Sequence, residues 1–269
     1  ERVEVEGADR DAIYSKIKED PKLSIVEEDK NAALLFDTYN EKVETLLSIK
    51  IGTVEDNLCL SRIPGDERSK ICTPQETLKN GSDIATLVAH AFREMAKASD
   101  IAIQNGGGVR TDISSGDITM GDAYKLLPFA NTLVEMDMSG AEIKLVLEEA
   151  IEYALQPDGS DGAFPYAAGL RWHVDSTRAS GNRLSKMEYK GRSDADWVPL
   201  NMEKMYRIVT NNYIAAGRDG YLSFKTVKDD GRFEDTYLDY AQSFVDYVKD
   251  RGSIAKLPFS EYSTQSFVK

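Results

Sequence analysis

The sequence predicts an α+β domain in which a mixed sheet is flanked by helices. Segments with helical spacing and short apolar segments typical of strands both occur along the chain. They do not alternate regularly, as they would in a doubly wound parallel sheet. No internal repeat or low-complexity segment interrupts them, and 269 residues suffice for one large domain or one domain plus an accessory segment.

Five helices are expected where apolar residues recur at helical spacing. Their approximate ranges are 9–19, 28–48, 82–95, 139–154 and 235–251. Ser82 or Asp83 can cap the third helix, and Ser139–Glu142 has the pattern of a capping box. The second helix precedes Gly52 and is either an interdomain connector or an ordinary docking helix.

Strands are expected where short apolar or alternating runs end at turn residues. Their ranges are 101–103, 132–138, 170–175, 184–191 and 206–213. Two stretches, 52–79 and 156–168, are expected to be irregular.

The charge of the chain limits its partners. The formal net charge of −13 repels nucleic-acid backbones and anionic membranes. A few local arginines can still hold a small phosphate-bearing ligand inside a cleft. No stretch approaches the roughly 20 apolar residues that span a bilayer. We therefore expect a small-molecule partner, no nucleic acid and no membrane span.

The two cysteines, Cys59 and Cys72, flank one short segment that contains Pro64 and Gly65. They form either one structural disulfide in an exported protein or two unrelated thiols in a cytosolic protein. Their position around a single loop favours the disulfide.

Residues for catalysis are missing from the sequence. The two histidines, His90 and His173, belong to no Asp-x-His, Asn-His-Glu or His-x-His arrangement of the kind that binds metals in two-metal phosphatases. There is no Walker loop and no Gly-x-Ser-x-Gly elbow. We expect no catalytic residue, metal ligand or cofactor site in this chain.

Three other segments carry binding chemistry. Asn105–Arg110 follows a strand, and its three glycines, Gly107 among them, allow close approach to a ligand and positive φ angles. In that segment Asn105 can bond a base edge and Arg110 a phosphate. The alternative is a tight glycine turn with an exposed arginine.

The second segment, 126–131, contains Phe129, which is either a ring that stacks on a planar ligand or a core residue. The third, 211–221, delivers Tyr213 and then presents Asp219 in a glycine-bounded turn. A carboxylate there suits the two vicinal hydroxyls of a ribose. An ordinary hairpin turn is the alternative.

In this order and spacing, the three segments resemble the C-terminal substrate-binding domain of the 5′-nucleotidase family, which includes UDP-sugar hydrolases, 5′-nucleotidases and NAD nucleotidases. Further matching stretches are 116–119, 139–143 and 163–167. The resemblance implies a leader and interdomain linker helix over residues 1–50 and the substrate-binding domain over residues 51–269. The Cys59–Cys72 segment is closest to the NAD-nucleotidase-like bacterial branch.

The resemblance also implies roles for individual residues. Phe129 and Tyr213 would sandwich the base, and Asp219 would accept the ribose hydroxyls. Asn105 would touch the base, while Arg110 and Arg68 would bind phosphate. Because base stacking needs only the aromatic ring, the hydroxyl of Tyr213 is expected to contribute little.

This sequence departs from the family pattern at three positions. Cys72 falls where many relatives place an arginine, so Arg62 or Arg68 would have to supply that phosphate contact. Tyr213 replaces the usual phenylalanine, and Arg218 replaces the second glycine of the usual Gly-Gly-Asp-Gly turn.

By resemblance, the parent protein is a periplasmic or cell-surface hydrolase of nucleotides of the AMP, NAD or UDP-sugar class. A catalytic N-terminal domain, absent from this chain, would be the partner of the present domain and would hold two divalent metal ions. The chain alone is expected to be inactive. The alternative is a non-catalytic nucleotide-binding or scavenging module.

Overall fold

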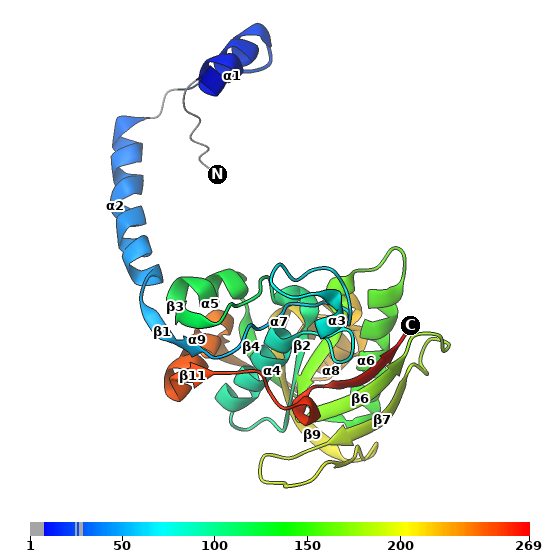
Figure 1. The fold of residues 1–269 in the computed structure, drawn as a ribbon. Helices are drawn as coiled ribbons and strands as arrows, with labels where there is room; N and C mark the ends of the chain where they lie inside the picture. The colour runs from blue at the N-terminus through cyan, green and yellow to red at the C-terminus, as the bar shows by residue number, and fades with distance from the viewer. Residues whose placement is uncertain (1–7, 25, 27–28) are drawn as a thin grey trace. The chain divides into compact units, whose positions relative to one another are not determined.

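The computed structural model describes residues 8–24, 26 and 29–269 (Figure 1). The chain divides between Leu46 and Leu47 into two compact units. The first unit contains helix α1 (Ala8–Glu19) and nearly all of helix α2 (Lys30–Leu47). The expected start of the second helix at Glu28 lies outside the described residues.

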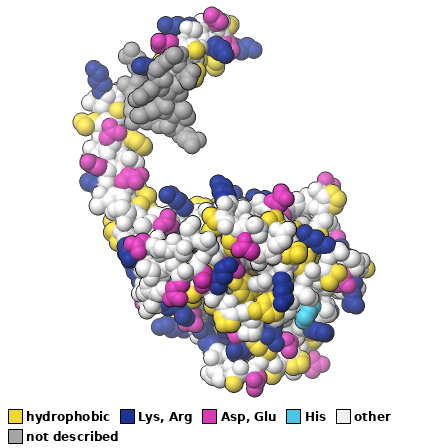
Figure 2. Space-filling model, in the orientation of Figure 1, with side chains coloured by type: hydrophobic (Ala, Val, Ile, Leu, Met, Phe, Trp, Pro, Cys, Tyr) yellow, Lys and Arg dark blue, Asp and Glu magenta, His cyan; other side chains and the backbone are white. Residues whose placement is uncertain are grey.

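Helix α2 begins where Asp29 accepts hydrogen bonds from the backbone nitrogens of Asn31 and Ala32, both at 2.9 Å. None of the residues of α2 is buried. Its apolar side chains are exposed and include Phe36, Tyr39 and Val43 (Figure 2). The helical spacing of these residues therefore gives an amphipathic helix but no core within the first unit.

The second unit contains three sheets among residues 47–269. The largest has the strand order β10-β4-β9-β2-β5, and the other two have the orders β11-β1-β3 and β12-β6-β7-β8. The strands are β1 (Lys50–Val54), β2 (Ile101–Asn105), β3 (Gly116–Thr119), β4 (Thr132–Ser139), β5 (Pro165–Ala168), β6 (Leu170–Asp175), β7 (Leu184–Tyr189), β8 (Val198–Pro199), β9 (Met205–Asn211), β10 (Phe233–Asp239), β11 (Ser253–Ile254) and β12 (Thr264–Val268).

Helices pack on the sheets of the second unit (Figure 1). They are α3 (Pro74–Thr77), α4 (Asp83–Met95), α5 (Met120–Leu126), α6 (Gly140–Leu155), α7 (Asn212–Ala215), α8 (Leu222–Asp229) and α9 (Tyr240–Arg251). Helix α4 is the most buried of them, and it packs against α9, β2 and β5. Its stripe from Ile84 to Phe92 lies entirely in the core, which explains why this helix carried the clearest apolar pattern.

The central sheet is mixed, and this places two chain ends side by side. Strands β2 and β9 run parallel, with Ile101 opposite Ile208. Strand β4 is antiparallel to β9, and β5 is antiparallel to β2. The carboxyl ends of β2 and β9 therefore meet at one edge of the sheet, where ligands of α/β sheets commonly bind.

The α+β fold class with mixed sheets and flanking helices is confirmed, but three boundaries were wrong. Residues 235–239 form strand β10, which pairs with β4, and the final helix begins only after Asp239, whose carboxylate accepts the backbone N–H of Gln242 at 2.7 Å. The stretch 156–168 contains β5. Strand β9 ends at Asn211, which caps α7 by accepting the N–H of Ile214 at 3.1 Å.

Four further elements, α5, α8, β1 and β12, were not expected. Their residues are short or mixed in polarity, and they become ordered through partners distant in sequence. Strand β1 pairs with β11 about 200 residues later, with Thr53 opposite Ser253. Strand β12 pairs with β6, with Phe267 opposite Val174. Long-range pairing of this kind leaves no periodicity to read.

The capping box of α6 provides a test of stability. Glu142 accepts hydrogen bonds from Arg232 at 2.7 Å and from the backbone of Ser139 at 2.8 Å. The bond from Arg232, together with those from Ser139, outweighs burial and lowers the pKa of Glu142 from 4.5 to about 2. This ionised carboxylate stabilises the fold above pH 4.5, and the stabilisation is lost as the pH falls towards 2.

We therefore expect Glu142→Gln to destabilise the fold more at about pH 6 than at about pH 3, by about 1–2 kcal/mol. Glutamine can still cap the helix, so the pH-dependent part reports the charge. Urea unfolding at the two pH values measures it. Glu203→Gln, at an exposed glutamate, is the matched control. A cost of Glu142→Gln that does not change with pH would contradict the assignment.

Candidate functional site

A cleft of about 330 Å³ opens at the carboxyl ends of β2 and β9. This volume is in the range of small-molecule sites. It is lined by Arg62, Asn105, Gly107, Gly108, Arg110, Phe129, Asn131, Ser160, Gly162, Tyr213 and Asp219. The cleft thus combines two exposed aromatic rings, two arginines and a carboxylate.

A buried polar network forms the floor of the cleft. The side-chain amide of Asn211 donates to Gln104 Oε1 at 3.0 Å and to Asn105 Oδ1 at 3.1 Å. Gln104 Nε2 in turn donates to the Tyr240 hydroxyl at 3.0 Å, and that hydroxyl donates to the carbonyl of Gly108 at 2.8 Å. All four side chains are almost completely buried. Because buried polar groups need partners, this network fixes their orientations.

The glycines of the first segment serve close packing, and the expectation of positive φ was wrong for them. Positive φ occurs at other glycines of the described chain but not at Gly106, Gly107 or Gly108, which form a short 3-10 turn. A Cβ at Gly107 would lie 3.0 Å from the Cα of Gly162. A Cβ at Gly108 would lie 2.2 Å from Gln104 Nε2 and 2.5 Å from the Tyr240 hydroxyl. Larger residues would therefore break the floor of the cleft.

Asp219 projects from a tight turn beside α7. Gly217 and Gly220 adopt φ angles of 82° and 78°, and Asp219 itself has φ of 52°. Aspartate tolerates this left-handed conformation better than most residues. Arg218 is not among the residues with positive φ, so an arginine in place of glycine leaves this turn unstrained at that position.

The Asp219 carboxylate is held from two sides. Asn105 Nδ2 donates to Asp219 Oδ2 at 2.9 Å, and the Tyr213 hydroxyl donates to Oδ1 at 3.0 Å. Tyr213 lies on α7 rather than on a strand, because β9 already ends at Asn211. Asn105 therefore lines the cleft as expected from the sequence, but its amide group is engaged with a carboxylate.

Phe129 and Arg110 lie together on the cleft. The Arg110 guanidinium carbon is 5.7 Å from the centroid of the Phe129 ring, and its Nη1 donates to the carbonyl of Gly107 at 3.1 Å. Phe129 is 44% exposed and Tyr213 is 43% exposed, so neither ring belongs to the core. This rules out the core interpretation of Phe129.

Two more arginines share one carboxylate near the cleft. Arg62 Nη1 bonds Asp161 Oδ1 at 2.6 Å, and Arg68 Nη2 bonds Asp161 Oδ2 at 2.8 Å. Burial raises the pKa of Asp161, but the hydrogen bonds from the two arginines outweigh it and hold the pKa below its usual value. Of this pair Arg62 lines the cleft, whereas Arg68 does not.

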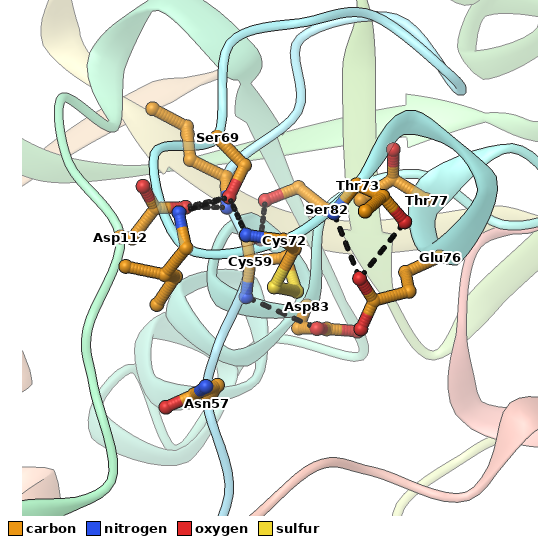
Figure 3. Close-up of a disulfide and its surroundings, with 12 residues drawn as sticks. Asn57, Cys59, Ser69, Cys72, Thr73, Glu76, Thr77, Ser82, Asp83 and Asp112 are labelled. Atoms are coloured by element: carbon orange, nitrogen blue, oxygen red, sulfur yellow. Dashed lines mark hydrogen bonds between the residues drawn. A yellow bond between two sulfur atoms is a disulfide. The ribbon is translucent and has the colours of Figure 1, made fainter.

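The loop that carries both arginines is closed by a disulfide between Cys59 and Cys72 (Figure 3). Asp112 also holds the loop, by accepting the backbone N–H of Leu60 at 2.6 Å and of Lys70 at 2.8 Å. The backbone N–H of Cys59 donates to the buried Asp83 at 3.0 Å. The loop that appeared irregular in the sequence is therefore fixed by covalent and polar contacts.

The structure adds Gly108, Asn131, Ser160 and Gly162 to the cleft. Asn131 ends the segment that contains Phe129, so proximity to that ring could have indicated it. Ser160 and Gly162 belong to a polar loop, where small residues are common for many reasons. Their position depends on contacts with Gly107 that the sequence does not reveal.

The histidines have structural partners. His90 Nε2 lies 3.2 Å from the carbonyl oxygen of Glu261, and His173 Nδ1 lies 2.7 Å from the hydroxyl of Ser266. Burial lowers the pKa of both. Within the described residues, Cys59, Cys72 and Glu76 are close enough to share an ion, but the disulfide occupies both sulfurs. No helix of the described chain is long and apolar enough to cross a membrane.

Residues 50–228 match the family model described as 5′-nucleotidase, C-terminal domain. The chain therefore belongs to the 5′-nucleotidase family and contains its C-terminal domain. Among curated proteins it is 35% identical over 99% of its length to the NAD 5′-nucleotidase of Haemophilus influenzae. It is also 34% identical over 91% of its length to a probable 5′-nucleotidase of Treponema pallidum.

Two solved structures have similar folds. The NAD nucleotidase of Haemophilus influenzae has a TM-score of 0.73 at 32% identity, over 99% of this chain and 46% of that one. A 5′-nucleotidase precursor from Thermus thermophilus has a TM-score of 0.71 at 31% identity, over 90% of this chain and 44% of that one. The chain spans only 43% and 41% of the two curated relatives, so more than half of each has no counterpart here.

The disulfide is expected to stabilise the fold by about 3 kcal/mol, since it closes a short loop in the unfolded chain. The double variant Cys59→Ser, Cys72→Ser should lose about this much free energy of unfolding in urea. Reduction of the unaltered chain should produce a similar loss, which serves as the control. Two free thiols found by mass spectrometry, in protein never exposed to reductant, would contradict the bridge.

Proposed function

We propose that residues 51–269 hold the nucleoside part of a nucleotide for a 5′-nucleotidase-type phosphohydrolase. The observation that supports this is the convergence of Phe129, Tyr213, Asp219 and Arg110 on one cleft from four separate segments. Aromatic faces stack on a planar base, a carboxylate accepts hydroxyl protons, and a guanidinium binds phosphate.

In this proposal Phe129 and Tyr213 stack on the base, and Asp219 accepts the ribose hydroxyls. Asn105 supports this part of the cleft through its bond to Asp219. Gly107 keeps the backbone low enough for a ligand to approach. Arg110 is the phosphate contact that lines the cleft, and Arg62 is a second one that the sequence placed behind Arg68.

Arg68 is the less direct phosphate contact, because it is paired with Asp161 and does not line the cleft. It would act on phosphate only after a rearrangement of this ion pair, or through the charge it adds near the cleft. The substrate class is a nucleotide such as AMP, NAD or a UDP-sugar.

Chemistry is assigned to a second domain outside this chain, as suggested by relatives more than twice as long. That domain would hold two divalent metal ions, which supply an activated water for attack on a phosphate ester or pyrophosphate. The residues of this chain would bind and orient the substrate. Residues 1–50, with helix α2, would be the leader and linker to that domain.

We also propose that the parent protein acts in the periplasm or at the cell surface. The disulfide supports this, since such bridges persist in oxidising compartments.

The purified chain should show no metal-stimulated phosphatase activity, because the metal ligands would lie in the other domain. Release of inorganic phosphate from AMP, with and without manganese or zinc, measures this. A full-length relative that contains both domains is the positive control. Robust metal-dependent hydrolysis by this chain alone would overturn the division of labour.

Phe129→Ala should weaken adenosine binding by about 2- to 10-fold, since one aromatic stack contributes about 0.5–1.5 kcal/mol. Ligand-observed NMR suits the weak affinity expected from half of a substrate site. Phe259→Ala is the matched control, because Phe259 is 39% exposed and does not line the cleft. Equal losses in the two variants would place the base elsewhere.

Arg110→Ala should weaken AMP by about 3- to 10-fold and adenosine by less than about 2-fold, because its partner is the phosphate. The same NMR titration compares the two ligands. Arg178→Ala, at an exposed arginine away from the cleft lining, controls for the general change in charge. An equal loss for both ligands would remove Arg110 from the phosphate site.

A further inference from the structure

The Tyr213 hydroxyl bonds the carboxylate proposed to bind ribose. It donates to Asp219 Oδ1 at 3.0 Å, while the amide of Asn105 donates to Oδ2 at 2.9 Å. The two donors come from different elements, the end of β2 and helix α7. Asp219 thus receives one protein hydrogen bond on each carboxylate oxygen.

The two donors differ in how they are fixed. Asn105 is buried, and its oxygen accepts bonds from Asn211 at 3.1 Å and from Gln104 at 3.3 Å, so its NH₂ group can only point towards Asp219. Tyr213 is half-exposed, and its ring lines the cleft. Burial, followed by the bond to Asp219, raises the pKa of Tyr213, so its hydroxyl remains a donor at neutral pH.

Two donors constrain a carboxylate more than one does. The terminal torsion of an aspartate is broad, so a single bond to Oδ2 leaves the carboxylate plane free to turn. A second bond to Oδ1 fixes that plane. Each oxygen keeps a further acceptor position, because an ionised carboxylate offers about four. Two vicinal hydroxyls can then donate one proton to each oxygen.

We propose that the Tyr213 hydroxyl is a positioning group that sets the Asp219 carboxylate for a ligand with two vicinal hydroxyls, and so makes Tyr213 a determinant of ribose specificity. This rests on the proposed nucleoside site. The ring and the hydroxyl of Tyr213 then have separate tasks, stacking and ribose recognition. A phenylalanine would retain the first and lose the second.

The test compares adenosine with 2′,3′-dideoxyadenosine, which lacks both hydroxyls. Calorimetry or ligand-observed NMR on the 269-residue chain gives the ratio of the two affinities. In Tyr213→Phe this ratio should fall by about 3- to 10-fold, as expected for a partly exposed hydrogen bond to a charged group. In an Asp219→Asn background, the same substitution should leave the ratio unchanged, because the carboxylate it positions is gone.

Tyr124→Phe is the matched control, since Tyr124 is 39% exposed and lies outside the cleft lining. It should leave the ratio unchanged. Thermal unfolding of each variant checks the fold. An unchanged ratio in Tyr213→Phe overturns the inference, and so does a fall of equal size in the Asp219→Asn background.

Failure of the proposed function would look different. If the unaltered chain bound neither adenosine nor dideoxyadenosine, the nucleoside site and this inference would both be wrong. If it bound the two equally, base stacking would stand, but Asp219 would not be the ribose acceptor, and the inference would be overturned.

Discussion

The buried hydrogen bonds that join Gln104, Asn105 and Asn211 are the constraint on which the cleft depends. These side chains leave parallel strands at the same edge of the central sheet, where no backbone partner remains for them. Left unpaired, each would cost about 1–3 kcal/mol. Their mutual bonds satisfy most of this demand and leave one amide group directed at Asp219. The floor of the cleft is therefore rigid before any ligand arrives.

The walls are arranged around this floor by loops fixed in other ways. A disulfide and Asp112 hold the loop that carries Arg62, and the turn with Asp219 is closed by glycines at positive φ. Tyr221 ties this turn to the opposite wall through a bond to the carbonyl of Ala163 at 2.8 Å. The cleft combines a fixed polar base with exposed aromatic rings, which suits a ligand that is flat at one end and charged at the other.

Sequence patterns predicted the parts of this site that have distinctive chemistry. Arg110, Phe129, Tyr213 and Asp219 stood beside glycines or at strand ends, and the structure brings them to one cleft. The bonds between them could not be predicted, because Asn105 and Asp219 lie 114 residues apart. For the same reason β10 was taken as helix: its pairing with β4 outweighs its local pattern.

The most direct test of the nucleoside site is a crystal structure of the chain with AMP. The base should lie between Phe129 and Tyr213, with both ribose hydroxyls on Asp219 and the phosphate towards Arg110. A base bound outside this cleft, or a ribose that does not contact Asp219, would contradict the proposed site.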